Sequence, residues 1–230
     1  MWCELRGLNQ NIKEYFDQEH IDDGPGSLLK TSYDYVDIDR AVKNLGDYDR
    51  LYCICGNESM KSARDLALDD RVDTNIIGIA KTIFNDMPGL ESIGFQTAVQ
   101  ELARYIDSAY IEASSTNSIV FLEVPGRHNS GLTTHAGLAR NSKITNVITP
   151  STRGDYRTSI EYSYGNRGYA VVVISEMCEY DYLITSLSVK AKVITPGYLI
   201  GAVDPCTYDS ILAERMVREA FNHAQEHRDF

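Results

Sequence analysis

The sequence has no long apolar run and no excess of basic residues. Its strongest apolar segments, Ile119–Val124 and Ala170–Ile174, have the length of strands and fall far short of the ~20 residues of a membrane helix. The 22 Lys and Arg residues are outnumbered by 33 Asp and Glu residues, which gives a net charge of −11. Nucleic acids and anionic membranes bind basic surfaces, so we expect neither as a partner.

Cysteines are few, and none is spaced for a zinc site. The five cysteines include no C-x-x-C pair and have no histidine at zinc-finger spacing. Cys53 and Cys55 lie in an apolar run, which predicts buried thiols on a strand. The residues Met1-Trp2-Cys3-Glu4 lack the basic and apolar regions of a secretory signal. An odd number of cysteines without a pairing pattern indicates a reducing compartment, so we expect a cytoplasmic protein.

The middle of the chain alternates β-rich runs with helical patterns. Several runs are apolar throughout, which is typical of strands covered on both faces. The alternation predicts an α/β fold with a mainly parallel sheet. The polar segment 151–168 is predicted to be an irregular loop. The predicted strands are Arg50–Cys55, Asn75–Ala80, Ile119–Val124, Ile144–Thr149, Tyr169–Ser175 and Lys192–Tyr198, and the predicted helices are Asn9–Glu19, Ser59–Leu68, Thr97–Ala113, His135–Arg140 and Tyr208–Ala224.

Several segments resemble motifs of the 6-phosphofructokinase family and follow in the family's order. Residues 77–86, Ile-Gly-Ile-Ala-Lys-Thr-Ile-Phe-Asn-Asp, resemble V-G-I-P-K-T-I-D-N-D, and residues 94–99 resemble the G-F-D-T-A-V helix after it. Residues 121–128, Phe-Leu-Glu-Val-Pro-Gly-Arg-His, are similar to V-V-E-V-M-G-R-H. Residues 168–176 resemble the K-G-H-A-V-V-V-V-S-E-G strand, and residues 205–216 resemble S-P-S-A-Y-D-R-I-L-A-T-R-M. The good match covers residues 50–216.

This resemblance implies two Rossmann-like lobes of three layers each, with mainly parallel sheets. Residues 1–94 and 200–230 would form a nucleotide-side lobe, and residues 95–199 would form a sugar-phosphate-side lobe. We expect the first lobe to be truncated, because the family's amino-terminal strand and the next strand have no counterpart here. Since members of the family are oligomers, we also expect a partner subunit.

The nucleotide side departs from the family's pattern. The family's G-G-D-G-S turn approaches nucleotide phosphates with its backbone and holds Mg²⁺ with its Asp. The corresponding residues here are Gly56, Asn57, Glu58 and Ser59. Asn57 has lost the charge that Mg²⁺ prefers. Glu58 replaces a glycine where close approach leaves no room for a side chain, and its carboxylate repels phosphate.

The residue at the position of the catalytic base is Phe84, where the family's T-I-D-N-D motif has its first Asp. A phenyl ring cannot accept the sugar hydroxyl's proton, so we predict no catalytic residue at this position. Asp86 matches the second Asp of the motif. Two positions that hold arginine in the family are occupied here by Ser118 and Tyr33. The family's Q-R-G-G-S turn is replaced by Ile200–Asp204.

The sugar-phosphate side is better preserved. Thr82, Asp86, Gly126, Arg127 and Glu176 match positions that bind sugar phosphate in the family, while Lys192 and Tyr198 stand where Arg and His are usual. Lys192 keeps the positive charge but lacks the two-pronged guanidinium of arginine. Two explanations of these residues stay open. They are compatible with a weakened pocket for fructose phosphates, but the explanation we favour is that they persist because they pack, with Arg127 paired to Glu123 or Asp86.

Two other patterns give weaker indications. His128 and His135, together with Asp86 and Glu123, suggest a metal site, but a seven-residue histidine spacing follows no ligand rule, so we predict no metal. Tyrosines are dense over Tyr156–Tyr182. If exposed, they would mark a protein-contact surface; the alternative is that they pack in the core.

The leading hypothesis is a phosphofructokinase-like pseudoenzyme, a regulatory or structural subunit that assembles with itself, with an intact phosphofructokinase or with a larger complex. No cofactor is expected. The first alternative is an active 6-phosphofructokinase with a divergent site, which would use Mg-ATP. The second is a structural component of an unrelated large assembly.

Overall fold

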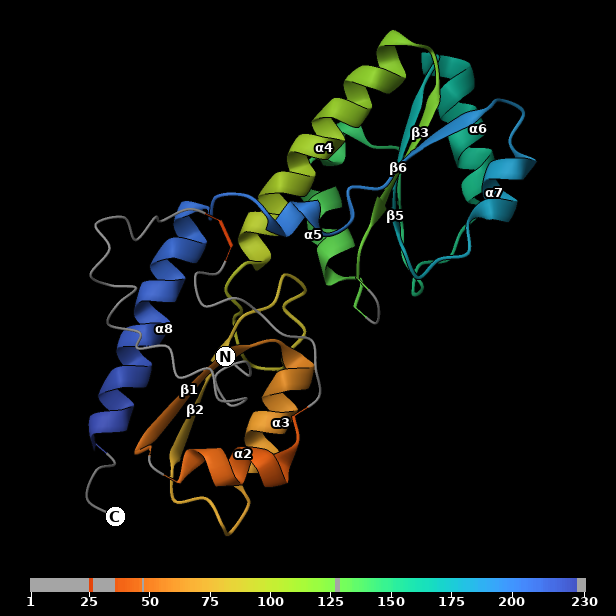
Figure 1. Ribbon diagram of the computed structural model, residues 1–230. Coiled ribbons are helices and arrows are strands. Elements are labelled where there is room, and N and C mark those ends of the chain that lie inside the picture. Colours follow the sequence, from red (N-terminus) through yellow and green to blue (C-terminus); the bar gives the residue numbers. More distant parts are fainter. Residues whose placement is uncertain (1–24, 27–35, 47, 127–128, 227–230) are drawn as a thin grey trace. The chain divides into compact units, whose positions relative to one another are not determined.

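The computed structural model describes residues 25–26, 36–46, 48–126 and 129–226, which divide into two compact units. Unit 1 contains the described residues up to Thr82, Met87–Gly94 and the segment from Asp204 onward. Unit 2 contains Ile83–Asp86 and Phe95–Val203. Each unit has its own sheet and its own helices (Figure 1).

Unit 1 is built on two parallel strands, β1 (Arg50–Cys55) and β2 (Asn75–Ala80), with helices on both faces (Figure 1). On one face, α2 (Ile38–Leu45) and α3 (Asn57–Ala67) bury Leu45 and Leu66. On the other face, Ala220 and Ala224 of α8 (Thr207–Glu226) pack against Ile77 and Ile79. This arrangement places the loop after β1 at the amino end of α3, a common location for ligand-binding turns.

Unit 2 is a four-stranded parallel sheet in the order β4-β5-β3-β6. Its strands are β3 (Ile119–Val124), β4 (Asn146–Ile148), β5 (Ala170–Ser175) and β6 (Ala191–Ile194). One face packs on α4 (Phe95–Ser115) and α5 (Gly131–Ala139), and the other on α6 (Tyr156–Arg167) and α7 (Asp181–Ser186) (Figure 1). Two short 3₁₀ helices, η2 (Asn141–Lys143) and η3 (Gly197–Gly201), complete the described elements.

The predicted α/β class with parallel sheets is confirmed. β1, β2 and β3 have the predicted bounds, and each is a mostly apolar run of six residues. β4 is shorter than the predicted Ile144–Thr149. β6 ends at Ile194 rather than at Tyr198, which lies in η3.

The prediction of a loop over 151–168 is wrong, because residues 156–167 form α6. Asp155 caps this helix by accepting a hydrogen bond from Thr158 N, 3.0 Å away. Gly168 ends it in a left-handed conformation, with φ 79°. Only Ile160 and Ser163 of the helix are fully buried. Its apolar stripe is therefore too narrow to register as helical periodicity. The helices α2 and α7 also lie outside the predicted helices.

Several expectations fall outside the described residues. These are the helix Asn9–Glu19, Tyr33, Arg127 and His128. The truncation of the first lobe and the functional assignment of the two lobes stay predictions. Within the residues that the structure describes, no helix combines the length and apolar character needed to cross a membrane.

Gly168→Ala should destabilise the protein by about 1 to 2 kcal/mol, because alanine disfavours the left-handed conformation. Its Cβ would also lie 3.0 Å from Asn117 Oδ1. The matched control is Gly165→Ala within the same helix, where a Cβ meets no atom within 4 Å. This control should instead stabilise by about 0.5 to 1 kcal/mol. Urea unfolding measures both, and equal effects would contradict the role given to Gly168.

Candidate functional site

The turn after β1 carries a carboxylate at the amino end of α3. Gly56 precedes the helix in extended conformation, with φ −82° and ψ −179°. Its carbonyl accepts a hydrogen bond from Met60 N at 2.9 Å and closes the first turn. Glu58, in that first turn, pairs with Lys61 Nζ at 2.8 Å, and both side chains are exposed. A carboxylate here interacts favourably with the helix dipole, the same interaction that a bound phosphate would use.

Gly56 lies next to the end of β2, also in unit 1. A Cβ on Gly56 would be 3.6 Å from the carbonyl oxygen of Lys81 and 4.0 Å from Thr82 Cβ. Thr82 is buried, with 8% of its surface exposed. The structure therefore brings together two of the predicted positions, Gly56 and Thr82, through the parallel pairing of β1 with β2.

The segment Ile83–Asp86 belongs to unit 2. Asn85 has a left-handed backbone, with φ 48°, a conformation that asparagine tolerates better than most residues. Phe84 and Ile83 pack against the core that contains Leu102 and Leu132. Among the described residues, no hydrogen-bond donor reaches the buried Oδ1 of Asp86. Phe84 thus contributes apolar packing at the position where the sequence predicts the loss of a base.

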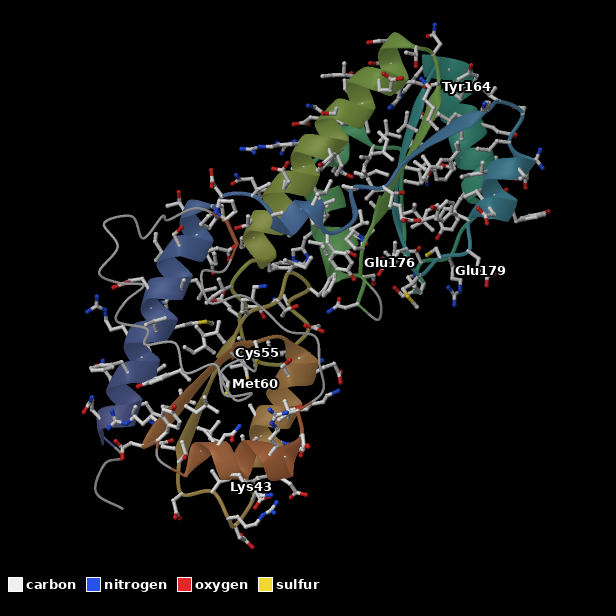
Figure 2. The ribbon with its side chains drawn as sticks, in the orientation of Figure 1. Lys43, Cys55, Met60, Tyr164, Glu176 and Glu179 are labelled. Carbon is white, nitrogen blue, oxygen red and sulfur yellow. The ribbon has the colours of Figure 1, made fainter. Side chains whose placement is uncertain are left out.

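The turn after β3 is bound to the end of β5. Gly126 N donates to Glu176 Oε1 at 2.9 Å, and Asn129 N donates to Gly126 O at 2.7 Å. Glu176, labelled in Figure 2, directly follows β5. The last residue of β5 pairs with Val124. A Cβ on Gly126 would lie 2.5 Å from the carbonyl oxygen of Asn129, so the tight turn requires glycine. Gly126 and Glu176, predicted separately, are in direct contact.

Asn129 is a residue that the sequence analysis missed. Its Oδ1 accepts a hydrogen bond from Gly131 N at 2.6 Å, and its Nδ2 donates to the carbonyl of Phe84 at 3.4 Å. The side chain therefore connects the turn after β3, the start of α5 and the segment Ile83–Asp86. An asparagine between a glycine turn and a helix start is a recognisable signal, since its side chain favours such positions.

Lys192 and Tyr198 lie apart from Gly126 and Glu176. Lys192 pairs with Val120 near the amino end of β3, whereas Gly126 follows the carboxyl end. At about 3.3 Å per residue, Val120 and Val124 alone are on the order of 13 Å apart. The Lys192 ammonium forms an ion pair with Glu112 and a 3.0 Å hydrogen bond with Thr116 Oγ1. Tyr198 lies in η3 and is 59% exposed.

The tyrosines of residues 156–182 divide into packed and exposed ones. Tyr180 stacks on Phe121 and donates its hydroxyl to Glu123; burial, followed by that hydrogen bond, raises the pKa of Tyr180 well above its usual range. Tyr164 donates to the carbonyl of Asn117 at 3.1 Å. Tyr162 and Tyr182 are exposed.

In the part of the chain that the structure describes, no three His, Cys, Asp or Glu side chains gather as a metal site requires.

Comparison with known families gives one match over nearly the whole chain, since residues 5–224 match the model of the family described as phosphofructokinase. The chain belongs to the phosphofructokinase family. The resemblance seen in the sequence motifs is therefore confirmed.

Among curated relatives, an ATP-dependent 6-phosphofructokinase of Hamiltonella defensa is 32% identical over 187 residues, or 77% of this chain and 57% of the relative. ATP-dependent 6-phosphofructokinase 7 of Arabidopsis thaliana is 29% identical over 70% of this chain and 36% of its own length. The chain thus spans about a third to somewhat over half of these phosphofructokinases.

Solved structures agree on the fold. A pyrophosphate-dependent phosphofructokinase of Nitrosospira multiformis aligns with a TM-score of 0.73 at 21% identity, over 83% of this chain and 56% of that one. The Pichia pastoris phosphofructokinase in its T-state aligns with a TM-score of 0.77 at 21% identity, over 87% and 24%. At this identity the similarity establishes the phosphofructokinase fold over part of those chains.

Gly126→Ala should destabilise the protein by roughly 1 to 3 kcal/mol, because the added Cβ overlaps backbone that cannot move independently. The control is Gly46→Ala, where a Cβ finds no atom closer than 3.9 Å. Urea unfolding should show a large loss for Gly126→Ala and little change for Gly46→Ala. A Gly126→Ala protein as stable as wild type would disprove the tight turn.

Proposed function

We propose that this chain is a phosphofructokinase-family protein without phosphoryl-transfer activity, which acts as a regulatory or structural subunit. The single observation that carries the proposal is Phe84 at the position of the family's catalytic base. A phenyl ring has no lone pair for the sugar hydroxyl's proton, and a general base commonly contributes about 10²- to 10⁴-fold in rate. The packing of Phe84 against the unit 2 core supports a structural use of this position.

The nucleotide side supports the same proposal. Phosphoryl transfer depends on positioning and on neutralising phosphate charge with metal and cationic groups. The amino end of α3 instead carries the Glu58 carboxylate, and Asn57 replaces the residue expected to hold Mg²⁺. We therefore expect no nucleotide binding at Gly56, Asn57, Glu58 and Ser59, and no cofactor.

A weakened site for fructose phosphates in unit 2 is part of this proposal. Its support is the turn in which Gly126 N is bound to Glu176, beside the segment that contains Asp86. The amides of Gly126 and Asn129 already donate within the protein, so the group of this turn that could serve a sugar is the Glu176 carboxylate, an acceptor for hydroxyl groups. Lys192 lies near the other end of the sheet, so within its own chain it is a poor candidate for a ligand group of this turn.

The activity test measures the transfer of phosphate from Mg-ATP, and separately from pyrophosphate, to fructose 6-phosphate. We expect the wild-type chain to remain at background. The double variant Phe84→Asp/Glu58→Gly restores the family's residue types at both positions. It should also stay at background, because the arginines expected from the family remain absent at Ser118 and in Ile200–Asp204.

The control for this test is Phe84→Asn/Glu58→Gly, which matches the double variant in size but lacks the basic carboxylate. The proposal would be overturned if the wild-type chain shows turnover above background and the Phe84→Asp double variant raises that turnover while the Phe84→Asn double variant does not. That result would establish the alternative, an active 6-phosphofructokinase with a divergent site.

We also propose that the chain functions in the cytoplasm with a partner, either a second copy, an intact phosphofructokinase subunit or a larger complex. The support for this is membership of the phosphofructokinase family, whose members are oligomers. Analytical ultracentrifugation should show oligomers or unstable chains in isolation. A monodisperse monomer that unfolds in one cooperative transition would contradict an obligate partner.

A further inference from the structure

Three sulfur-bearing side chains pack in one cluster between the sheet and α3 in unit 1. Cys53 and Cys55 are alternate residues of β1, so their side chains lie on the same face. Both are buried, and they pack in one cluster with Ala63 and Met60 of α3. Figure 2 labels Cys55 and Met60. We refer to Cys53, Cys55 and Met60 as the sulfur cluster.

The geometry brings the Met60 thioether next to the strand that carries the two thiols. Met60 Sδ occupies the space left by the missing side chain of Gly78, where a Cβ would lie only 2.5 Å away. Gly78 is the residue paired with Cys53 across the sheet. Cys55 Sγ lies 3.7 Å from the carbonyl oxygen of Cys53, so this thiol is turned back toward the backbone of the other cysteine.

All three potential metal ligands of the sulfur cluster are soft: two thiols and one thioether. The other side chains of the cluster, Leu51, Ala63 and Ile76, are apolar and offer no carboxylate or imidazole. Thiolate and thioether ligands favour copper(I) over Mg²⁺, which requires oxygen ligands. Two cysteines and one methionine are also one ligand short of the four-coordinate set of a structural zinc site. We propose that the sulfur cluster binds one copper(I) ion.

The sulfur cluster lies where the fold can stabilise a negatively charged complex of copper(I) with two thiolates. Binding by both thiols replaces two S–H bonds with two S–Cu bonds and releases two protons, which leaves a net charge of −1. Cys55 immediately precedes Gly56, the residue at the amino end of α3, and Met60 closes the first turn. The positive end of the helix dipole thus lies beside the charge that forms.

The test is competition for copper(I) under ascorbate between the full chain and the chromogenic chelator bicinchoninate. Cys3, Cys178 and Cys206 are first replaced by serine, so that only the two cluster thiols remain. This variant should withdraw one copper(I) per chain, with affinity that rises with pH because protons are released. Cys53→Ser or Cys55→Ser should weaken binding about 100-fold or more, since even the loss of groups that only support metal ligands costs 10- to 100-fold.

Met60→Leu keeps the volume of the side chain and removes the sulfur, so it tests the thioether without risk to the fold. It should weaken copper(I) binding at least about tenfold, while Met177→Leu, at an exposed methionine, should not. The proposal is overturned if the triple-serine variant takes no copper from bicinchoninate. It is also overturned if Met60→Leu binds as tightly as its parent, or if Cys53→Ser and Cys55→Ser leave the affinity unchanged.

Discussion

In unit 2, the amide of Gly126 and the carboxylate of Glu176 hold the carboxyl ends of two neighbouring strands together. The parallel register of β3 and β5 places these residues opposite each other, and the apolar strands fix that register by burial on both faces. Asn129 then connects the turn to the start of α5 and to the carbonyl of Phe84. The side chains of Glu176 and Asn129, bonded to backbone groups, therefore determine the shape of this candidate site, and that shape does not depend on a base at position 84.

This dependence is compatible with our proposal that the chain keeps the phosphofructokinase fold without its chemistry. Phe84 contributes to the unit 2 core, and Glu58 lies at the amino end of a helix, so each substitution suits its local structure. Gly126 is required by the close approach of Asn129, whether or not a ligand binds. Retained family residues are thus explained by packing in part, and only binding measurements separate the two roles.

The sequence predicted the sheets well because their strands are short apolar runs bounded by turn residues. It missed α6, whose buried stripe is limited to Ile160 and Ser163 and whose ends depend on Asp155 and Gly168. The contact of Gly126 with Glu176 needs the pairing of β3 with β5, which joins residues 50 positions apart. The separation of Lys192 from that turn likewise follows from the register of β6, which motif matching does not contain.

The most direct test of the account is a thermal-shift titration of the purified chain with fructose 6-phosphate, fructose 1,6-bisphosphate and Mg-ATP. A ligand that binds the native state raises the melting temperature in a saturable way. The account predicts a shift with the fructose phosphates and none with Mg-ATP. If none of the three ligands shifts the melting temperature, the sugar-phosphate site is rejected and a structural role is left as the explanation. A saturable shift with Mg-ATP would contradict the central claim that the nucleotide side has lost its function.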